Sequence, residues 1–207
     1  MTDNLKPNKL NIRNLQEIIA HGFQNAAKGF SGMIGEVMQV IDPSVQAISL
    51  KDIPMFLGSP ENDAVGIYLR VEGEVSGQIM LILPYDKAME IVDLLFEQPF
   101  GTTTQLGKME RSALAEVGNM TGTFFLNAVA EMTGYTARPT PPAVMVDMVG
   151  AILDVIIATM GQTDQSVFNE KVLMFQSNFS IGERHTKANF WIIPDPDTLE
   201  KLSRSGK

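Results

Sequence analysis

The chain has 207 residues, a formal net charge of −8 at pH 7, 44% hydrophobic residues and 19% charged residues. These values are ordinary for a globular protein, and the length allows one substantial core. The acidic balance argues against nucleic acid or an anionic membrane surface as a partner, because phosphate contacts need clustered Lys and Arg. The absence of Cys excludes disulfides, thiolate nucleophiles and Cys-ligated metals.

No N-terminal segment has the basic-then-apolar pattern of a secretion signal, and no apolar run reaches the roughly 18 residues that a membrane span needs. We therefore expect a cytoplasmic protein. His21 and His185 lie far apart in the sequence and have no metal-ligand spacing. No Gly-rich phosphate loop occurs either, so we expect neither a metal site nor a cofactor of the protein's own.

The first half of the chain begins with residues 1–11, which are polar, carry Pro7 and predict a flexible arm. Helical periodicity follows, interrupted by Gly22, Gly29 and Gly32, which indicate close approach of another element. The elements predicted for this half are a helix over 12–35, a strand over 36–50, a β-hairpin over 64–71 and 77–83, and a helix over 85–99.

The second half repeats this order with one additional helix. Its predicted elements are a long helix over 110–134, a Pro-led strand over 137–148, a helix over 149–162, a hairpin over 166–194 with its turn near Gly182, and a short helix over 195–206. Trp191 lies in an apolar strand pattern, so we expect it in the core.

The repeated order indicates an internal duplication. Glu17 and Pro43 match Glu116 and Pro142 at one constant offset along the sequence. We therefore predict a single domain over 12–207, built of two repeats at about 12–108 and 109–207. The fold class is α/β of the α+β kind, with a pseudo-twofold arrangement of long helices packed on antiparallel sheet.

The long helix over 110–134 carries a narrow polar ridge. Its members, which fall within an arc of roughly 80° at about 100° per residue, are Ser112, Glu116, Asn119, Thr123 and Asn127. The opposite face carries apolar residues, namely Leu114, Val117, Phe124, Phe125 and Met132. Asn is a weak helix former, so its repetition on the ridge favours a functional role. The alternative is an amphipathic helix that tolerates two Asn residues.

The ridge pattern, with Glu116 following Ser112 by four residues and preceding Asn119 by three, resembles the signature of the CheC/CheX/FliY phosphatases. Asn127 and Pro142 agree with it. The resemblance covers nearly the whole chain and is strongest to CheC, as in the segments "MERSALAEVGNM", "PPAVMVDMVGAILD" and "PDPDTLEKL".

The resemblance implies a phosphatase that acts on the phosphorylated chemotaxis response regulator CheY. Asn119 would position the attacking water at the acyl phosphate, and Glu116 would pair with the regulator's active-site Lys. Ser112, Thr123 and Asn127 would support the ridge, and Mg²⁺ would come from the regulator. Such a division is physically reasonable, because phosphoryl transfer depends mainly on positioning and charge placement.

The first helix departs from the family pattern, because the repeat places Ala20 where Asn119 stands in the second helix, although Glu17 matches Glu116. We therefore predict one active site, on the second helix. The alternative is that a neighbouring Gln, such as Gln24, rescues the first site.

The resemblance also implies a second partner, the receptor deamidase CheD, with Asp154 and Ile152 as candidate contacts. We expect a monomer or a weak dimer. The alternative to an enzyme is a non-catalytic binding module that sequesters a response regulator or CheD.

Overall fold

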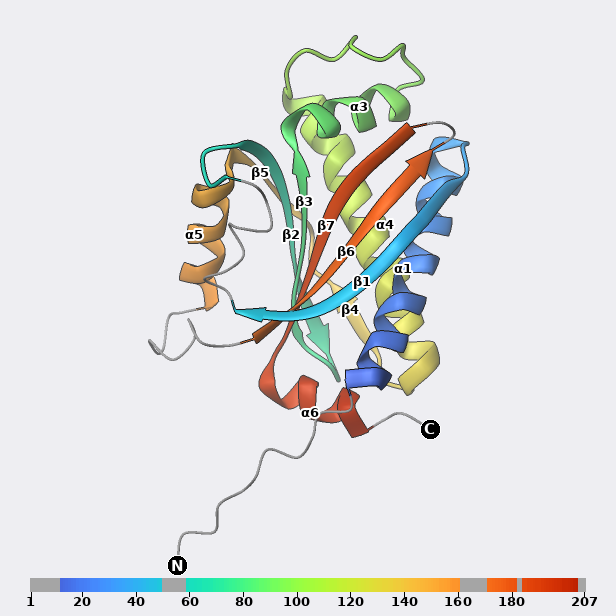
Figure 1. Ribbon diagram of the computed structural model, residues 1–207, viewed down its shortest axis with the longest axis vertical. Coiled ribbons are helices and arrows are strands. Elements are labelled where there is room, and N and C mark those ends of the chain that lie inside the picture. Colours follow the sequence, from blue (N-terminus) through green and yellow to red (C-terminus); the bar gives the residue numbers. More distant parts are fainter. Residues whose placement is uncertain (1–11, 50–58, 161–170, 182–183, 205–207) are drawn as a thin grey trace, which may run out of the picture.

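The computed structural model describes residues 12–49, 59–160, 171–181 and 184–204 (Figure 1). The predicted arm over 1–11 lies outside these residues, as do Gly182 and its turn. The helices are α1 (Ile12–Ile34), α3 (Tyr85–Leu95), α4 (Lys108–Thr133), α5 (Val149–Met160) and α6 (Pro196–Arg204). The strands are β1 (Met38–Ser49), β2 (Asp63–Gly73), β3 (Gly77–Pro84), β4 (Ala137–Pro139), β5 (Ala143–Met148), β6 (Lys171–Ile181) and β7 (Arg184–Pro194).

Within the described residues, the strands form one seven-stranded sheet in the order β1-β6-β7-β3-β2-β4, and β5 also pairs with β2. Both predicted hairpins are present, as β2–β3 and β6–β7. The two hairpins join through antiparallel pairing of β3 with β7, in which Met80 lies opposite Trp191 and Leu81 opposite Phe190. The predicted fold class of helices on antiparallel sheet is confirmed.

The prediction of one strand over 137–148 is wrong, because the structure has two short strands there. Both pair with β2, β4 near its end and β5 near its start. Pro141 and Pro142 fall between them and carry no N–H to donate to a sheet ladder, so they interrupt the pairing. Thr140 bridges the gap by exchanging hydrogen bonds with the backbone of Arg70.

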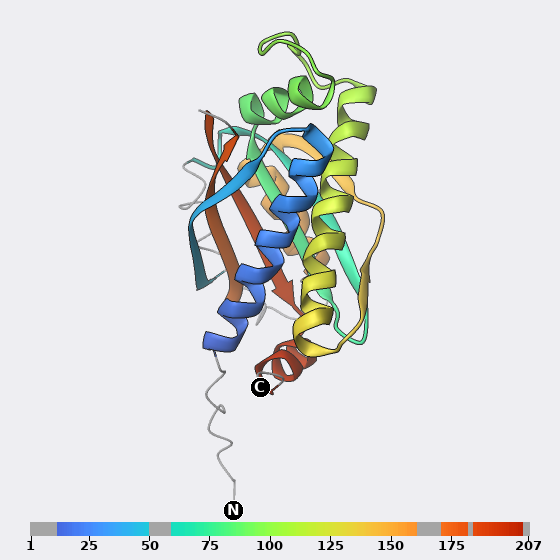
Figure 2. The same cartoon turned by 90° about the vertical axis from the view of Figure 1, so that its right-hand side faces the viewer.

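Helices α1 and α4 lie side by side and antiparallel across one face of the sheet (Figure 2). Three aromatic rings join this helix pair to the sheet. Phe23 of α1 packs edge-on against Phe190 of β7, with ring centroids 4.4 Å apart. Phe125 of α4 lies 5.7 Å from Phe23 and 5.8 Å from Phe190. Such pairs add to the burial energy, so the cluster fixes the helix pair on the sheet.

The glycines of α1 mark the helix contact at two of the three predicted positions. A Cβ atom on Gly22 would lie 2.4 Å from the Phe125 ring, and one on Gly29 would lie 2.0 Å from the Phe124 ring. At Gly32 the prediction is wrong, because an added Cβ would meet no atom within 4 Å.

Helix α5 packs on the opposite face of the sheet, where Ile152 and Leu153 join Met80 and Trp191 in a second apolar cluster. Trp191 is 0% exposed, as expected of a core residue. Among the described helices, none combines the length and the apolar character that crossing a bilayer would require.

The strand order is symmetrical. Exchanging β1, β2 and β3 for β4/β5, β6 and β7 returns the same order read backwards. The exchange also swaps α1 with α4, which are the two helices on the shared face. This symmetry supports the division into repeats over 12–108 and 109–207, which stays a prediction.

Candidate functional site

Helix α4 buries one side against the sheet and α1. Leu114, Val117 and Phe125 are buried there, as the helical period predicts. Met132 does not follow the prediction, because its side chain is 40% exposed. It lies in the last turn, two residues before Gly134, which ends the helix in a left-handed conformation with φ 77°. The apolar face therefore ends before the helix does.

Two glycines let α4 approach β2 closely. A Cβ atom on Gly118 would lie 2.3 Å from the Cγ2 atom of Ile67, and one on Gly122 would lie 3.3 Å from a methyl carbon of Leu69. Both glycines are buried. Because Gly118 directly precedes Asn119, the strand contact fixes the backbone from which the Asn119 side chain projects.

The polar ridge of α4 faces away from the sheet. Ser112, Glu116, Thr123 and Asn127 are exposed, and Asn119 is half-buried. Within the described part of the chain, neither the Glu116 carboxylate nor the Asn119 amide has a hydrogen-bond or ion-pair partner. A carboxylate and an amide spaced i, i+3 lie on one face about 5–6 Å apart at Cβ, so both can enter one shallow cleft on a partner.

The two hydroxyl groups of the ridge are engaged within the helix. Ser112 Oγ donates to the backbone oxygen of Lys108 at 2.9 Å, and Thr123 Oγ1 donates to that of Asn119 at 2.8 Å. Hydroxyl groups in helices commonly make such bonds to the preceding turn. Ser112 and Thr123 therefore present mainly their carbon atoms and spare acceptor capacity, which leaves Glu116, Asn119 and Asn127 as the polar groups available to a partner.

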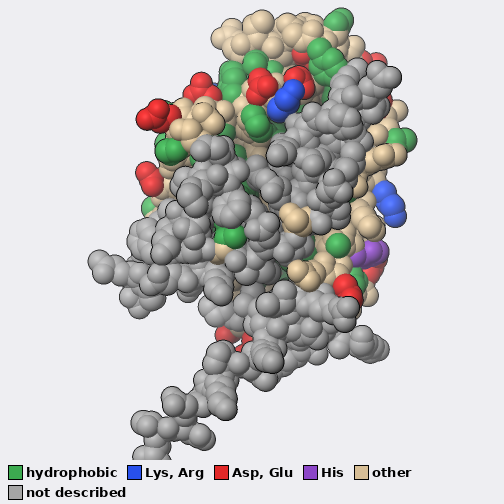
Figure 3. Space-filling view, in the orientation of Figure 1, with side chains coloured by type: hydrophobic (Ala, Val, Ile, Leu, Met, Phe, Trp, Pro, Cys, Tyr) green, Lys and Arg blue, Asp and Glu red, His purple; other side chains and the backbone are tan. Residues whose placement is uncertain are grey.

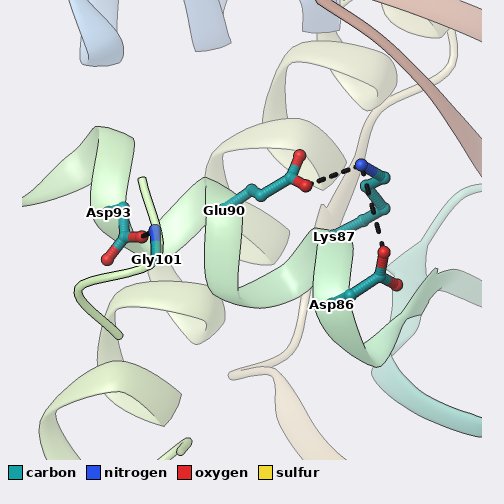
Figure 4. A network of polar contacts seen from close by, with 5 residues as sticks. All are labelled: Asp86, Lys87, Glu90, Asp93 and Gly101. Atoms are coloured by element: carbon teal, nitrogen blue, oxygen red, sulfur yellow. Dashed lines mark hydrogen bonds and ion pairs between the residues drawn. The ribbon is translucent and has the colours of Figure 1, made fainter. Parts of the chain in front are cut away.

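The loop before α4 is anchored by Asp93, a residue that the sequence did not single out. It is 1% exposed, and its carboxylate accepts a hydrogen bond of 2.8 Å from the backbone N–H of Gly101 (Figure 4). A second hydrogen bond of 2.8 Å comes from the backbone N–H of Thr103. Burial raises the pKa of Asp93, but these hydrogen bonds outweigh it and hold the pKa below its ordinary value. At about 100° per residue Asp93 falls on the polar side of α3, beside Asp86 and Glu90, so the sequence carried no signal of its burial.

The end of the same loop is fixed at Leu106, which is buried. Its N–H donates to the hydroxyl oxygen of Tyr85 at 3.3 Å, and its carbonyl oxygen accepts from Nε of Arg111 at 3.0 Å. Leu106 is therefore bonded to Tyr85 of α3 and to Arg111 of α4, and these two bonds fix the start of α4.

The corresponding site on α1 lies at the opposite end of the helix pair. Glu17 is exposed and Ala20 is half-buried. His21 Nε2 lies 3.4 Å from a carboxylate oxygen of Glu131, near the end of α4. Because the helices are antiparallel, Glu17 lies near the end of α4, whereas Glu116 lies near its start. Glu17 and Glu116 therefore cannot reach the same group on a partner. The site on α1 also has no amide side chain, because Ala20 stands where Asn119 stands on α4.

Asp154 and Ile152 of α5 lie on different sides of their helix. Asp154 is exposed, whereas Ile152 is 1% exposed. The Ile152 side chain packs over Gly66 of β2, where an added Cβ atom would lie 2.8 Å from Ile152 Cγ2. Ile152 packs α5 against the sheet, and its candidate role as a partner contact stays a prediction. Among the described side chains of α5, Asp154, Val155 and Ala158 are exposed.

The described surface shows little positive charge where it can be seen. On the face drawn in the space-filling view, the coloured Lys and Arg side chains are few and do not gather (Figure 3). Among the described residues, no group of three or more His, Asp or Glu side chains could hold a metal ion.

The CheC-like family matches residues 109–146, a segment that begins in the first turn of α4 and includes the whole polar ridge. The chain is 26% identical over 190 residues to the CheY-P phosphatase CheC of Bacillus subtilis, covering 91% of this chain and 90% of that protein.

The resemblance to CheC-like proteins is confirmed.

Solved structures agree on the fold. FliY of Thermotoga maritima aligns with a TM-score of 0.70 at 20% identity over 96% of both chains. The CheX–CheY–BeF3–Mg²⁺ complex of Borrelia burgdorferi contains a chain that aligns with a TM-score of 0.54 at 16% identity, over 85% of this chain and 97% of that one. The CheC-like segment includes Glu116 and Asn119 but not Glu17 or Asp154.

Proposed function

We propose that this CheC-like chain dephosphorylates a phosphorylated CheY-type response regulator through the ridge of α4. One observation carries the proposal: Glu116 and Asn119 project together from a helix that is fixed on the sheet, and no neighbouring described side chain engages them. The name of the Bacillus subtilis relative, CheY-P phosphatase CheC, supports the substrate.

In the proposed mechanism, the chain supplies position and charge. Asn119 enters the acyl-phosphate site of the regulator, where its amide orients a water in line with the phosphorus. Water attacks the phosphorus, the bond to the aspartyl oxygen breaks, and inorganic phosphate leaves. Glu116 pairs with the regulator's active-site Lys and sets the register of docking. Mg²⁺ belongs to the regulator and neutralises the charge that develops on the phosphoryl oxygens.

We propose one active site for each chain. Glu17 keeps the docking charge on α1, but the methyl group of Ala20 cannot orient water. Gln24 is exposed one turn further along α1. Its spacing from Glu17 is not that of the Glu116–Asn119 pair, so it is a poor replacement.

CheD remains a second proposed partner, through the exposed surface of α5 at Asp154. Ile152 is buried in the same helix, so we expect Asp154 to carry more of this contact than Ile152. A phosphatase assay with and without CheD would detect the coupling as a change in rate that Asp154→Lys abolishes.

The proposal is tested by following the decay of the source organism's regulators after phosphorylation with a small-molecule phosphodonor. Wild-type protein should accelerate the release of phosphate from at least one of them over buffer alone. Tight binding without acceleration, both with and without CheD, would instead support the non-catalytic binding module.

A further inference from the structure

The thioether side chain of Met109 is 69% exposed in the first turn of α4. At about 100° per residue, Met109 falls within the same roughly 80° arc as the polar ridge. It precedes Glu116 by two turns, or about 10 Å along the axis, and Asn119 by about 15 Å. The ridge therefore has an apolar end, which the sequence pattern of its polar members did not include.

Exposure alone carries no argument, because single exposed apolar residues are common on protein surfaces. Met132 shows this on the same helix, since it is exposed but lies about 140° around the axis from Met109. Met109 differs in its alignment with Glu116 and Asn119.

The backbone beneath Met109 is also held in place. Leu106 is buried and hydrogen-bonded through both its N–H and its carbonyl oxygen, and Arg111 provides one of these bonds from within α4. Asp93 fixes the preceding part of the loop. An apolar residue on a fixed backbone loses little backbone conformational entropy on binding, which favours a docking contact.

We propose that Met109 is an apolar docking residue for the receiver domain whose acyl-phosphate site takes Glu116 and Asn119. This inference rests on the proposed function. A helix that places polar groups in a pocket meets the pocket's rim with the residues one to two turns away on the same face. Met adapts its shape to apolar and aromatic side chains, so it suits such a rim contact.

The test compares Met109→Ala with the matched control Met132→Ala, using the regulator that wild-type protein dephosphorylates best. Met109→Ala should raise KM for the phosphorylated regulator about fivefold to twentyfold, with kcat within about twofold of wild type, because it removes apolar contact area but no reacting group. Binding to the regulator loaded with BeF3 and Mg²⁺ should weaken by the same factor. Met109→Leu should restore most of the affinity, and Met132→Ala should match wild type.

Equal KM and binding for Met109→Ala and wild type would overturn the inference while leaving the proposed function intact. A loss confined to kcat would also overturn it. Failure of wild-type protein both to bind and to dephosphorylate any regulator of the source organism would refute the proposed function and the docking role together.

Discussion

At the scale of single residues, the roles proposed for Glu116 and Asn119 follow from the chemistry of their side chains. A carboxylate can attract and orient a cationic partner, whereas a neutral amide can both donate to and accept from a water without repelling a phosphoryl group. Their positions followed from the sequence, because helical geometry alone fixes which residues share a face.

The docking role proposed for Glu116 predicts that its substitution weakens binding to the regulator. Glu116→Ala should raise KM for the phosphorylated regulator by at least about tenfold, as expected for truncating one partner of a close charge pair, and should lower kcat less. Steady-state kinetics at several salt concentrations would measure both, and the variant should show a weaker salt dependence of KM than wild type. A fall in kcat at unchanged KM would assign Glu116 to chemistry.

Asp93 predicts a pH-dependent contribution to stability. Its pKa in the folded chain is lowered, so its contribution is present above the unfolded pKa of about 3.9 and is lost as the pH falls through the lower folded value. Asp93→Ala should cost about 1–3 kcal/mol of unfolding free energy at pH 7, and the difference from wild type should shrink below about pH 4. Urea unfolding at several pH values measures this difference.

The control for Asp93 lies on the same helix. Asp86 is exposed and lies 3.9 Å from Lys87 Nζ in a surface ion pair (Figure 4). Asp86→Ala should change stability by less than about 1 kcal/mol. Equal costs for the two substitutions, or a cost at Asp93 that is independent of pH, would contradict the anchoring role.

At the scale of elements, α4 and its partners were partly predictable. Gly22 and Gly29 correctly indicated a packed helix neighbour, because glycine in a helix is costly without a close contact. Gly32 has the same sequence signal and no contact. The division of the predicted strand into β4 and β5 at Pro141 and Pro142 depends on how this segment pairs with β2, which the local sequence does not indicate. The anchoring by Asp93 depends on a loop whose path has no periodic pattern.

The close contact of α4 with β2 predicts opposite effects of one substitution at two glycines. Gly118→Ala should destabilise the protein by about 1–3 kcal/mol, because the added methyl group would overlap Ile67. Gly32→Ala, in open space on α1, should stabilise it by up to about 1 kcal/mol. Thermal or urea unfolding would compare them, and a neutral Gly118→Ala would show that α4 is not held against β2 as described.

At the scale of the whole molecule, the joined sheet explains how two similar halves present different surfaces. Each hairpin was predictable from its local alternation, but the pairing of β3 with β7 joins residues far apart in the sequence and has no local signal. The antiparallel helices place Glu17 and Glu116 at opposite ends of one face. Ala20 on α1 therefore lies too far from Asn119 to disturb the proposed site on α4.

The most direct test of this account is the rate of phosphate release from the phosphorylated regulator with Asn119→Ala, beside Glu17→Ala and wild type. The account predicts that Asn119→Ala loses activity by about 10²-fold or more, the effect expected of removing a positioning group. It predicts that Glu17→Ala keeps the wild-type rate. An active Asn119→Ala together with an inactive Glu17→Ala would place the chemistry on α1 and contradict the central claim.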